Sequence, residues 1–205
     1  MKRLLLVSLL LAGFGYRSAA QVSVITFDDL WTGGDFDITG SDYGGVYWEQ
    51  GNAGFQGYTG GWVTGYNGSG AICYSPQNNI VNRWCSTLTG IAFPSVVDVE
   101  GAYFAIAATS GTSTTGVRVH GFLNGSEIET TGWFNQIGRT PVWFNMNLNG
   151  VDRIVIESVP TVLGAGWYGM DNFTYTVVPE PGVTTLTILG SILLLRRERG
   201  GRRAA

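Results

Sequence analysis

The stretch VRVHGFLNGSEI, residues 117–128, decides the fold class of this 205-residue chain. Small and apolar residues occupy the odd positions from 117 to 123, and Arg118, His120 and Phe122 occupy the even positions. An alternation with period two is typical of a strand that buries one face. The pair Asn124-Gly125 follows, which is the favoured two-residue hairpin turn, and Ile128 continues in a returning strand. The stretch therefore predicts a β-hairpin.

A second stretch, VWFNMNLNGVDRIVIE at residues 142–157, follows the same logic. Apolar residues at the even positions from 142 to 148 line one face, Asn149-Gly150 is a predicted turn, and residues 151–157 return. Further strands are expected near residues 22–27, 96–107 and 167–177, which gives at least seven strands. These strands, with few helix formers between them, predict an all-β domain built as a jelly-roll-like two-sheet β-sandwich.

The N-terminus has the three parts of a secretory signal peptide, in order. Lys2 and Arg3 supply positive charge, residues 4–14 are an apolar run, and Ser18-Ala19-Ala20 offers small side chains to a signal peptidase. We therefore expect a signal peptide at residues 1–20, removed by signal peptidase, and a sandwich domain at residues 21–177.

The C-terminus contains three blocks. Val178-Pro179-Glu180-Pro181 ends any strand, because proline lacks the backbone donor and restricts its neighbour. Residues 182–195 are uncharged and apolar, and an arginine cluster follows at 196, 197, 199, 202 and 203. Arginines resist crossing a bilayer and hold their end in the cytoplasm. A 14-residue helix is about 21 Å long, against about 30 Å of hydrocarbon, so this is a short span that suits transient insertion.

This end of the chain resembles the PEP-CTERM sorting signal of Gram-negative bacteria, which combines a Pro-Glu-Pro motif, a hydrophobic helix and an arginine-rich tail. Residues 178–181 match the motif, and Arg196, Arg197 and Arg199 match the start of the tail. The resemblance implies that residues 178–205 are a sorting signal recognised by an exosortase, with removal of the tail and delivery to the cell surface or the exopolysaccharide matrix. The alternative is an ordinary single-pass membrane anchor.

The domain between the two ends is strongly acidic. Residues 21–177 hold 13 aspartates and glutamates against four arginines and no lysine, a net charge of −9. Nucleic acid is therefore excluded as a partner, because no basic patch is available to neutralise phosphates. Divalent cations remain plausible partners.

A structural Ca²⁺ is the cofactor that we expect. In a jelly roll the first and last strands lie side by side, so Asp28 or Asp29 can approach Asp171 and Asn172. Calcium accepts six to eight oxygen ligands in flexible geometry. The alternative, which the sequence favours slightly, is that these short acidic side chains bond nearby backbone amides in turns.

Residues 43–74 contain eight aromatic residues among ten glycines. Exposed rings at Trp48, Tyr58 and Trp62 could stack on sugar faces and bind a glycan. The alternative, which we favour, is that these rings fill the core, since Trp and Tyr are highly buried on average.

Cys73 and Cys85 are the only two cysteines, and both follow the signal peptide. An exported chain reaches an oxidising compartment, which predicts a disulfide between them. Two free buried thiols are the alternative.

The domain also resembles the sandwich domains that precede PEP-CTERM tails, at residues 26–30 (TFDDL), 150–156 (GVDRIVI) and 169–175 (GMDNFTY). Those domains are carbohydrate-binding-like in shape, so the resemblance implies a fold more than an activity.

Evidence for catalysis is slight. His120 is the only histidine, which excludes a multi-histidine zinc site, and no nucleophile motif surrounds it. Glu127 and Glu129 share one face of a predicted strand, as two glycosidase carboxylates could. We therefore expect a non-catalytic surface or matrix protein that binds glycan or packs in exopolysaccharide. A secreted polysaccharide hydrolase and a purely structural coat or adhesion protein are the alternatives.

Overall fold

The computed structural model describes residues 20–30, 36–52, 61–66, 73–75, 78–84, 86–107, 113–161 and 166–179. These ranges contain strands and no helix, and the compact unit spans Gln21–Val178. The ten strands are β1 (Gln21–Ile25), β2 (Ser41–Tyr43), β3 (Val46–Trp48), β4 (Gly61–Tyr66), β5 (Asn78–Arg83), β6 (Leu88–Ala105), β7 (Val117–Leu123), β8 (Ser126–Thr130), β9 (Val142–Ser158) and β10 (Gly169–Val177).

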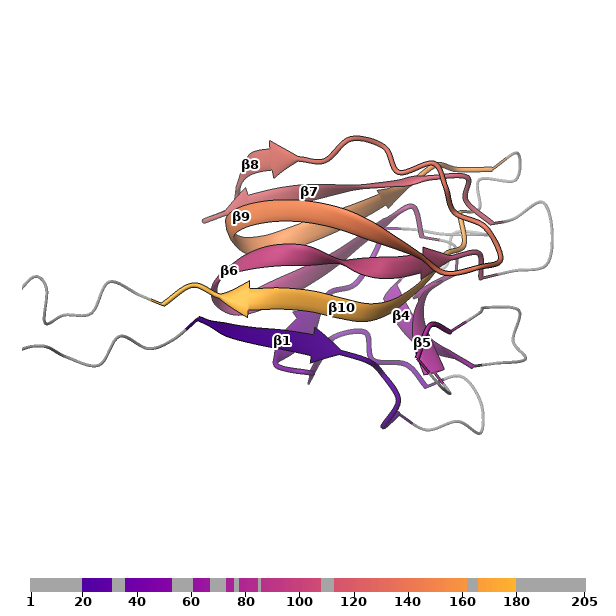
Figure 1. Cartoon of the computed structure of the whole chain (residues 1–205), viewed down its shortest axis with the longest axis horizontal. Helices are drawn as coiled ribbons and strands as arrows, with labels where there is room; N and C mark the ends of the chain where they lie inside the picture. The colour runs from indigo at the N-terminus through magenta and orange to yellow at the C-terminus, as the bar shows by residue number, and fades with distance from the viewer. Residues whose placement is uncertain are drawn as a thin grey trace, which may run out of the picture. The chain divides into compact units, whose positions relative to one another are not determined.

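The strands form one ten-stranded sheet that folds over on itself into two layers (Figure 1). All pairs of named strands are antiparallel. One layer holds β1, β10, the second half of β6 and the first half of β9. The other holds β2, β3, the first half of β6, the second half of β9, β7 and β8. The predicted all-β sandwich is confirmed.

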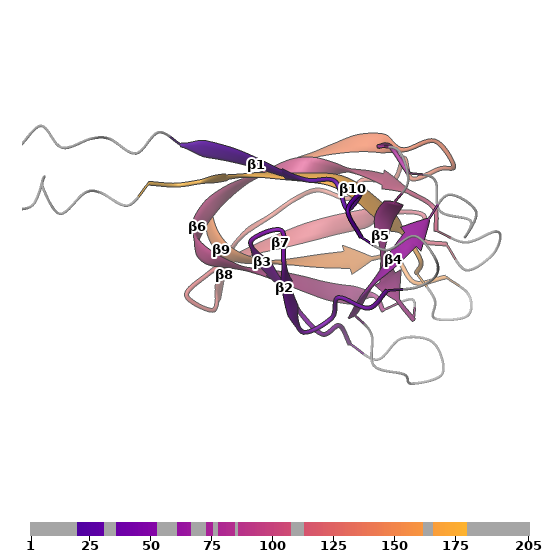
Figure 2. The ribbon, with the colours of Figure 1, turned by 90° about the horizontal axis from the view of Figure 1, so that it is seen from below.

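The two longest strands pass from one layer to the other, and Figure 2 shows β6 curving between them. The register of β6 against β9 shifts in the bend, where Val97 pairs with Val151 but Val99 pairs with Leu148. Strand β9 therefore carries one extra residue, which is a bulge. Gly150 has φ 67° there, and its N–H donates to Asp98 Oδ1 at 2.8 Å.

The predicted turn at Asn149-Gly150 is wrong, because β9 runs unbroken from Val142 to Ser158. Strand β6 pairs with residues on both sides of this dipeptide, so the ladder holds the chain in one direction. The hairpin at Asn124-Gly125 is confirmed. Both residues have positive φ, 51° and 78°, and Leu123 pairs directly with Ser126.

The core between the layers is aromatic. Trp48 and Trp62 are fully buried and contact each other edge to face, with ring centroids 5.1 Å apart. Their indole N–H groups donate to backbone carbonyls, Trp48 to Tyr43 O and Trp62 to Gly90 O, both at 3.0 Å. Neither ring faces solvent, so assigning glycan stacking to Trp48 and Trp62 is wrong, and the core alternative holds for both. Tyr58 lies outside the described residues.

The first and last strands of the domain lie side by side in the sheet, since β1 pairs with β10 from Gln21↔Val177 to Ile25↔Phe173. Beyond this ladder, Val178 N donates to Val96 O at 3.0 Å. The expected signal peptide up to residue 19 and the expected sorting tail from residue 180, with Glu180, Pro181 and the arginine cluster, lie outside the described residues. The described ranges contain no helix with the length and apolar character that a membrane crossing requires.

Candidate functional site

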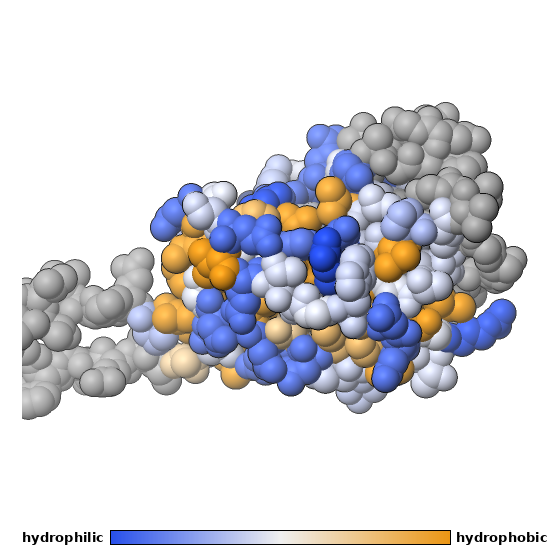
Figure 3. All heavy atoms as spheres, turned by 90° about the horizontal axis from the view of Figure 1, so that it is seen from above, coloured by the Kyte–Doolittle hydropathy of each residue, from blue (hydrophilic) through white to orange (hydrophobic). Residues whose placement is uncertain are grey.

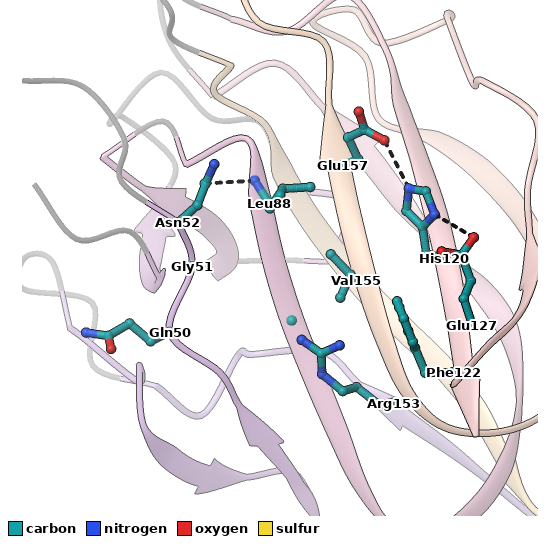
Figure 4. A pocket seen from close by; sticks show the side chains of 11 residues that line it. Gln50, Gly51, Asn52, Leu88, His120, Phe122, Glu127, Arg153, Val155 and Glu157 are labelled. Carbon is teal, nitrogen blue, oxygen red and sulfur yellow. Dashed lines mark hydrogen bonds and ion pairs between the residues drawn. The ribbon is translucent and has the colours of Figure 1, made fainter. Parts of the chain in front are cut away.

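An open groove lies on the outer face of the layer that contains β7, with a cavity volume of about 580 Å³ (Figure 4). It is lined by residues 50–52, 88, 90, 120, 122, 127, 153, 155 and 157. Strand β7 buries Val117, Val119 and Gly121, so its even-numbered residues point outward to the groove. Strands β9 and β6 supply alternate residues in the same way, and the segment 50–52 forms one wall.

An ion pair between Arg153 and Glu49 holds the Arg153 side chain in place at the floor of the groove. Arg153 Nε lies 2.8 and 2.9 Å from the two carboxylate oxygens of Glu49, and its Nη2 lies 2.8 Å from Oε2. The guanidinium also covers the Phe122 ring at 5.1 Å, a cation–π contact, and Figure 4 shows the two side chains next to each other. A Cβ on Gly90 would lie 2.0 Å from Glu49 Oε2, so glycine leaves the space that this carboxylate occupies.

The wall segment is fixed by Asn52. Its Nδ2 donates to Thr87 Oγ1 at 3.0 Å, and its Oδ1 accepts from Leu88 N at 3.0 Å and from the Ser86 hydroxyl. Gln50, two residues earlier, forms no side-chain hydrogen bond within the described ranges. Asn52 is therefore structural, whereas the Gln50 amide remains available to a ligand.

The opposite side of the groove holds an ionic network around His120. Its Nδ1 lies 3.1 Å from Glu127 Oε1, and its Nε2 lies 2.9 Å from Glu157 Oε2. Arg118 donates to the same Glu157 oxygen, and this bond is the main reason that the pKa of Glu157 is lowered. The Thr130 hydroxyl bonds Glu127 and is the main reason that the pKa of Glu127 is lowered.

Glu127 and Glu129, the candidate glycosidase carboxylates, bond different partners. A register shift in the β7–β8 ladder pairs Glu127 with the outward Phe122 but pairs Glu129 with the inward Gly121. Glu127 bonds His120, whereas Glu129 Oε2 accepts from Asn149 N at 3.2 Å. The two carboxylates therefore have separate partners, as an ordinary exposed strand face allows.

The predicted calcium residues lie where β1 and β10 meet. The buried Asp171 carboxylate accepts from Tyr74 N at 2.8 Å, Ser75 N at 2.9 Å and Asn172 N at 2.7 Å. Burial raises the pKa of Asp171, and these amide bonds oppose the shift. Asp29 accepts a hydrogen bond from the Tyr43 hydroxyl.

Asp171 thus bonds the backbone in the way that the turn alternative anticipated. No group of three His, Cys, Asp or Glu side chains gathers around a metal position within the described ranges. Two oxygens there, Asp28 Oδ1 and Asn172 Oδ1, are nevertheless buried without a hydrogen-bond partner among those residues. Calcium at this position stays a prediction.

The disulfide also stays a prediction, because Cys85 lies outside the described residues. Its expected partner Cys73 is half-buried.

Sequence reasoning missed Arg153, Phe122 and Glu157 as groove residues. The available signal was the alternation of 118, 120 and 122 against 153, 155 and 157, which places all six on the solvent face of paired strands.

No family model matches the chain, and no curated protein matches it. Among solved structures, the chain is similar to the CBM22-1 xylan-binding domain from Paenibacillus barcinonensis Xyn10C. The two share 15% sequence identity, the match covers 80% of this chain and 99% of that domain, and the TM-score is 0.42.

Proposed function

We propose that this protein is a non-catalytic glycan-binding protein of the cell surface or exopolysaccharide matrix, and that its β-sandwich binds a saccharide in the groove beside β7. An exosortase sorts it through the tail after Val177. The single observation that carries the binding proposal is the groove, a ligand-sized cavity on a rigid sheet face.

The chemistry of the groove suits a polyhydroxylated ligand. Leu88, Gly90 and Val155 give the floor an apolar surface, and Gln50, Arg153 and Glu157 provide donors and acceptors around it. Sugar rings present apolar faces and hydroxyl edges, which need this mixture. Figure 3 likewise shows hydrophilic and hydrophobic side chains interspersed on the face seen from above, rather than one apolar patch.

The export part of the proposal depends on the terminal segments. The signal peptide, the Pro-Glu-Pro motif and the arginine cluster support it as sequence features. Acidic character without lysine in residues 21–177 suits a protein that remains soluble within a hydrated matrix.

The binding proposal is tested by calorimetric titration of the purified protein with soluble xylan, mixed-linkage β-glucan and alginate. We expect saturable binding to at least one neutral polysaccharide, weakened at least several-fold by Arg153→Ala or Phe122→Ala. Tyr47→Ala is the matched control, because Tyr47 is an exposed ring that lies outside the groove. Absence of binding by a folded protein would favour a purely structural coat protein. Polysaccharide turnover that Glu127→Gln abolishes would favour a hydrolase.

A further inference from the structure

Trp133 is an exposed aromatic residue next to the groove, beyond the residues that line the cavity. It is 40% exposed, and the Arg118 guanidinium lies over its ring, with Cζ 4.7 Å from the ring centroid. Arg118 Nε also donates to Glu157, which lines the groove. A single arginine side chain therefore connects the ring to the wall of the groove.

The pairing with β7 determines which way Trp133 points. Phe134 N donates to Val117 O at 2.8 Å, and Val117 N donates to Phe134 O at 3.1 Å. Val117 is fully buried and the Phe134 ring stacks on Phe144, with centroids 4.8 Å apart, so both residues point toward the core. Because successive side chains of an extended chain point to opposite faces, Trp133 lies on the outer face beside Arg118. This is the face that carries the groove.

The groove itself holds a similar aromatic ring. The Arg153 guanidinium lies 5.1 Å from the centroid of Phe122, so Phe122 and Trp133 are each held by a cation–π contact. Phe122 and Arg118 are outward residues of β7, and four residues of a strand span about 13 Å. His120, between them in β7, lines the groove (Figure 4). The two rings therefore mark the ends of one strip along β7, and rings that are held before the ligand arrives lower the entropy cost of binding.

The charges on this strip favour a neutral ligand. Arg153 is paired with Glu49 and Arg118 with Glu157, so each guanidinium already faces a carboxylate. Glu127 adds a third carboxylate to the lining of the groove, and its side chain is half exposed. Three carboxylates against two guanidinium groups repel an anionic polymer such as a polyuronate, whereas a neutral sugar chain experiences no such repulsion.

We propose that Trp133 is a second sugar-stacking residue, and that the site takes a linear neutral polysaccharide lying along β7 from Phe122 to Trp133. Each ring packs against the apolar face of a different sugar unit, and the polar side chains between them bind hydroxyl groups. One sugar ring is much shorter than a strip of about 13 Å, so only a chain of several units reaches both rings. The inference rests on the proposed function, because it extends the same groove and names the class of saccharide.

The test is calorimetric titration of the intact purified protein with sugar chains of increasing length. The probes are xylobiose to xylohexaose and cellobiose to cellohexaose, with alginate as the anionic polymer. Wild-type affinity should increase several-fold from disaccharide to hexasaccharide, because only the longer chain reaches Trp133. Alginate should bind at least several-fold more weakly than xylan or mixed-linkage β-glucan. Alginate binding as tight as that of the neutral polymers would overturn the assignment of a neutral ligand.

Substitutions at Trp133 separate stacking from simple apolar contact. Trp133→Leu keeps an apolar side chain but removes the planar ring, so it should lower hexasaccharide affinity at least several-fold and leave disaccharide affinity unchanged. Trp133→Phe keeps a planar ring and should retain most of the gain with chain length. Tyr74→Ala is the matched control and should bind like the wild type, because Tyr74 is an exposed ring stacked on Tyr103 of the other layer.

Phe122→Ala should weaken the binding of short and long chains alike, because Phe122 lines the cavity itself. If Trp133→Leu binds chains of every length like the wild type, or weakens all of them equally, the second stacking position is overturned and the proposed function stands. If the folded wild-type protein binds no neutral chain, both are overturned.

Discussion

Gly90 shows how one missing side chain shapes the groove. A Cβ at this position would lie 2.0 Å from Glu49 Oε2 and 2.9 Å from Glu49 Cδ, so Gly90→Ala must displace the carboxylate that clamps Arg153. We expect several-fold weaker glycan binding with little change in melting temperature, because the displaced group is the end of a flexible side chain. Gly132→Ala is the matched control, since nothing lies within 4 Å of its added Cβ. Equal affinities for the two variants would contradict the role of the clamp.

Calcium binding is predicted at the unpartnered oxygens of Asp28 and Asn172. Added calcium should raise the melting temperature and chelator should lower it, because a ligand present at a hundredfold its Kd stabilises the folded state by about 2.7 kcal/mol. Asp28→Asn should remove the response. This substitution is sharper than one at Asp171, whose carboxylate also holds the amides of Tyr74 and Ser75.

Asp152→Asn is the control for this experiment, because it removes the same charge from a carboxylate that bonds Asn124 N in the β7–β8 turn. It should retain the calcium response. A melting temperature that changes with neither calcium nor chelator would contradict the predicted calcium site.

At the scale of single elements, the sequence predicted the local hairpin correctly but did not predict that a long strand passes from one layer to the other. The hairpin of β7 and β8 could be predicted because Asn124-Gly125 and the alternation before it act locally. The same dipeptide at Asn149-Gly150 forms a bulge instead, because β6 pairs along both halves of β9. Turn chemistry alone does not reveal a neighbouring strand that overrides it.

The predicted disulfide would join the two sides of β5, because Cys73 precedes Asn78–Arg83 in the sequence and Cys85 follows it. A denatured, unreduced sample should show no reactive thiol. Reduction should destabilise the fold by about 3 kcal/mol, the chain-entropy value for a loop of about 15 residues. The double variant Cys73→Ser, Cys85→Ser should melt at the temperature of the reduced protein. Two thiols in the unreduced sample would exclude the bridge.

At the scale of the whole molecule, the groove could not be predicted from sequence because its parts are distant in the chain. Glu49 and Arg153, for example, are 104 residues apart and meet only when β3 and β9 both flank β6. The core was easier to anticipate, since burial of Trp48 and Trp62 follows from hydrophobicity. Which aromatic ring faces outward depends on strand register, and register is a property of the assembled sheet.

The tail prediction also concerns the whole molecule. Surface-released protein should lack the chain from about Pro181 onward, because the apolar stretch after it is too short for a comfortable anchor. Intact-mass spectrometry measures the end directly. Peptides that contain Arg196 or Arg202 in the released material would contradict processing, and a full-length membrane-bound form alone would indicate an ordinary anchor.

The pairing of β10 on both sides has a mechanical consequence when the end of the domain is pulled. Strand β10 pairs with both β1 and β6 over residues 174–177, so a pull on Val178 along the strand axis loads two hydrogen-bond ladders together. Bonds loaded in parallel share a shearing force, whereas bonds at a strand end open one after another. A force applied at this end of the domain would therefore enter it through a strand that resists shear on both of its edges.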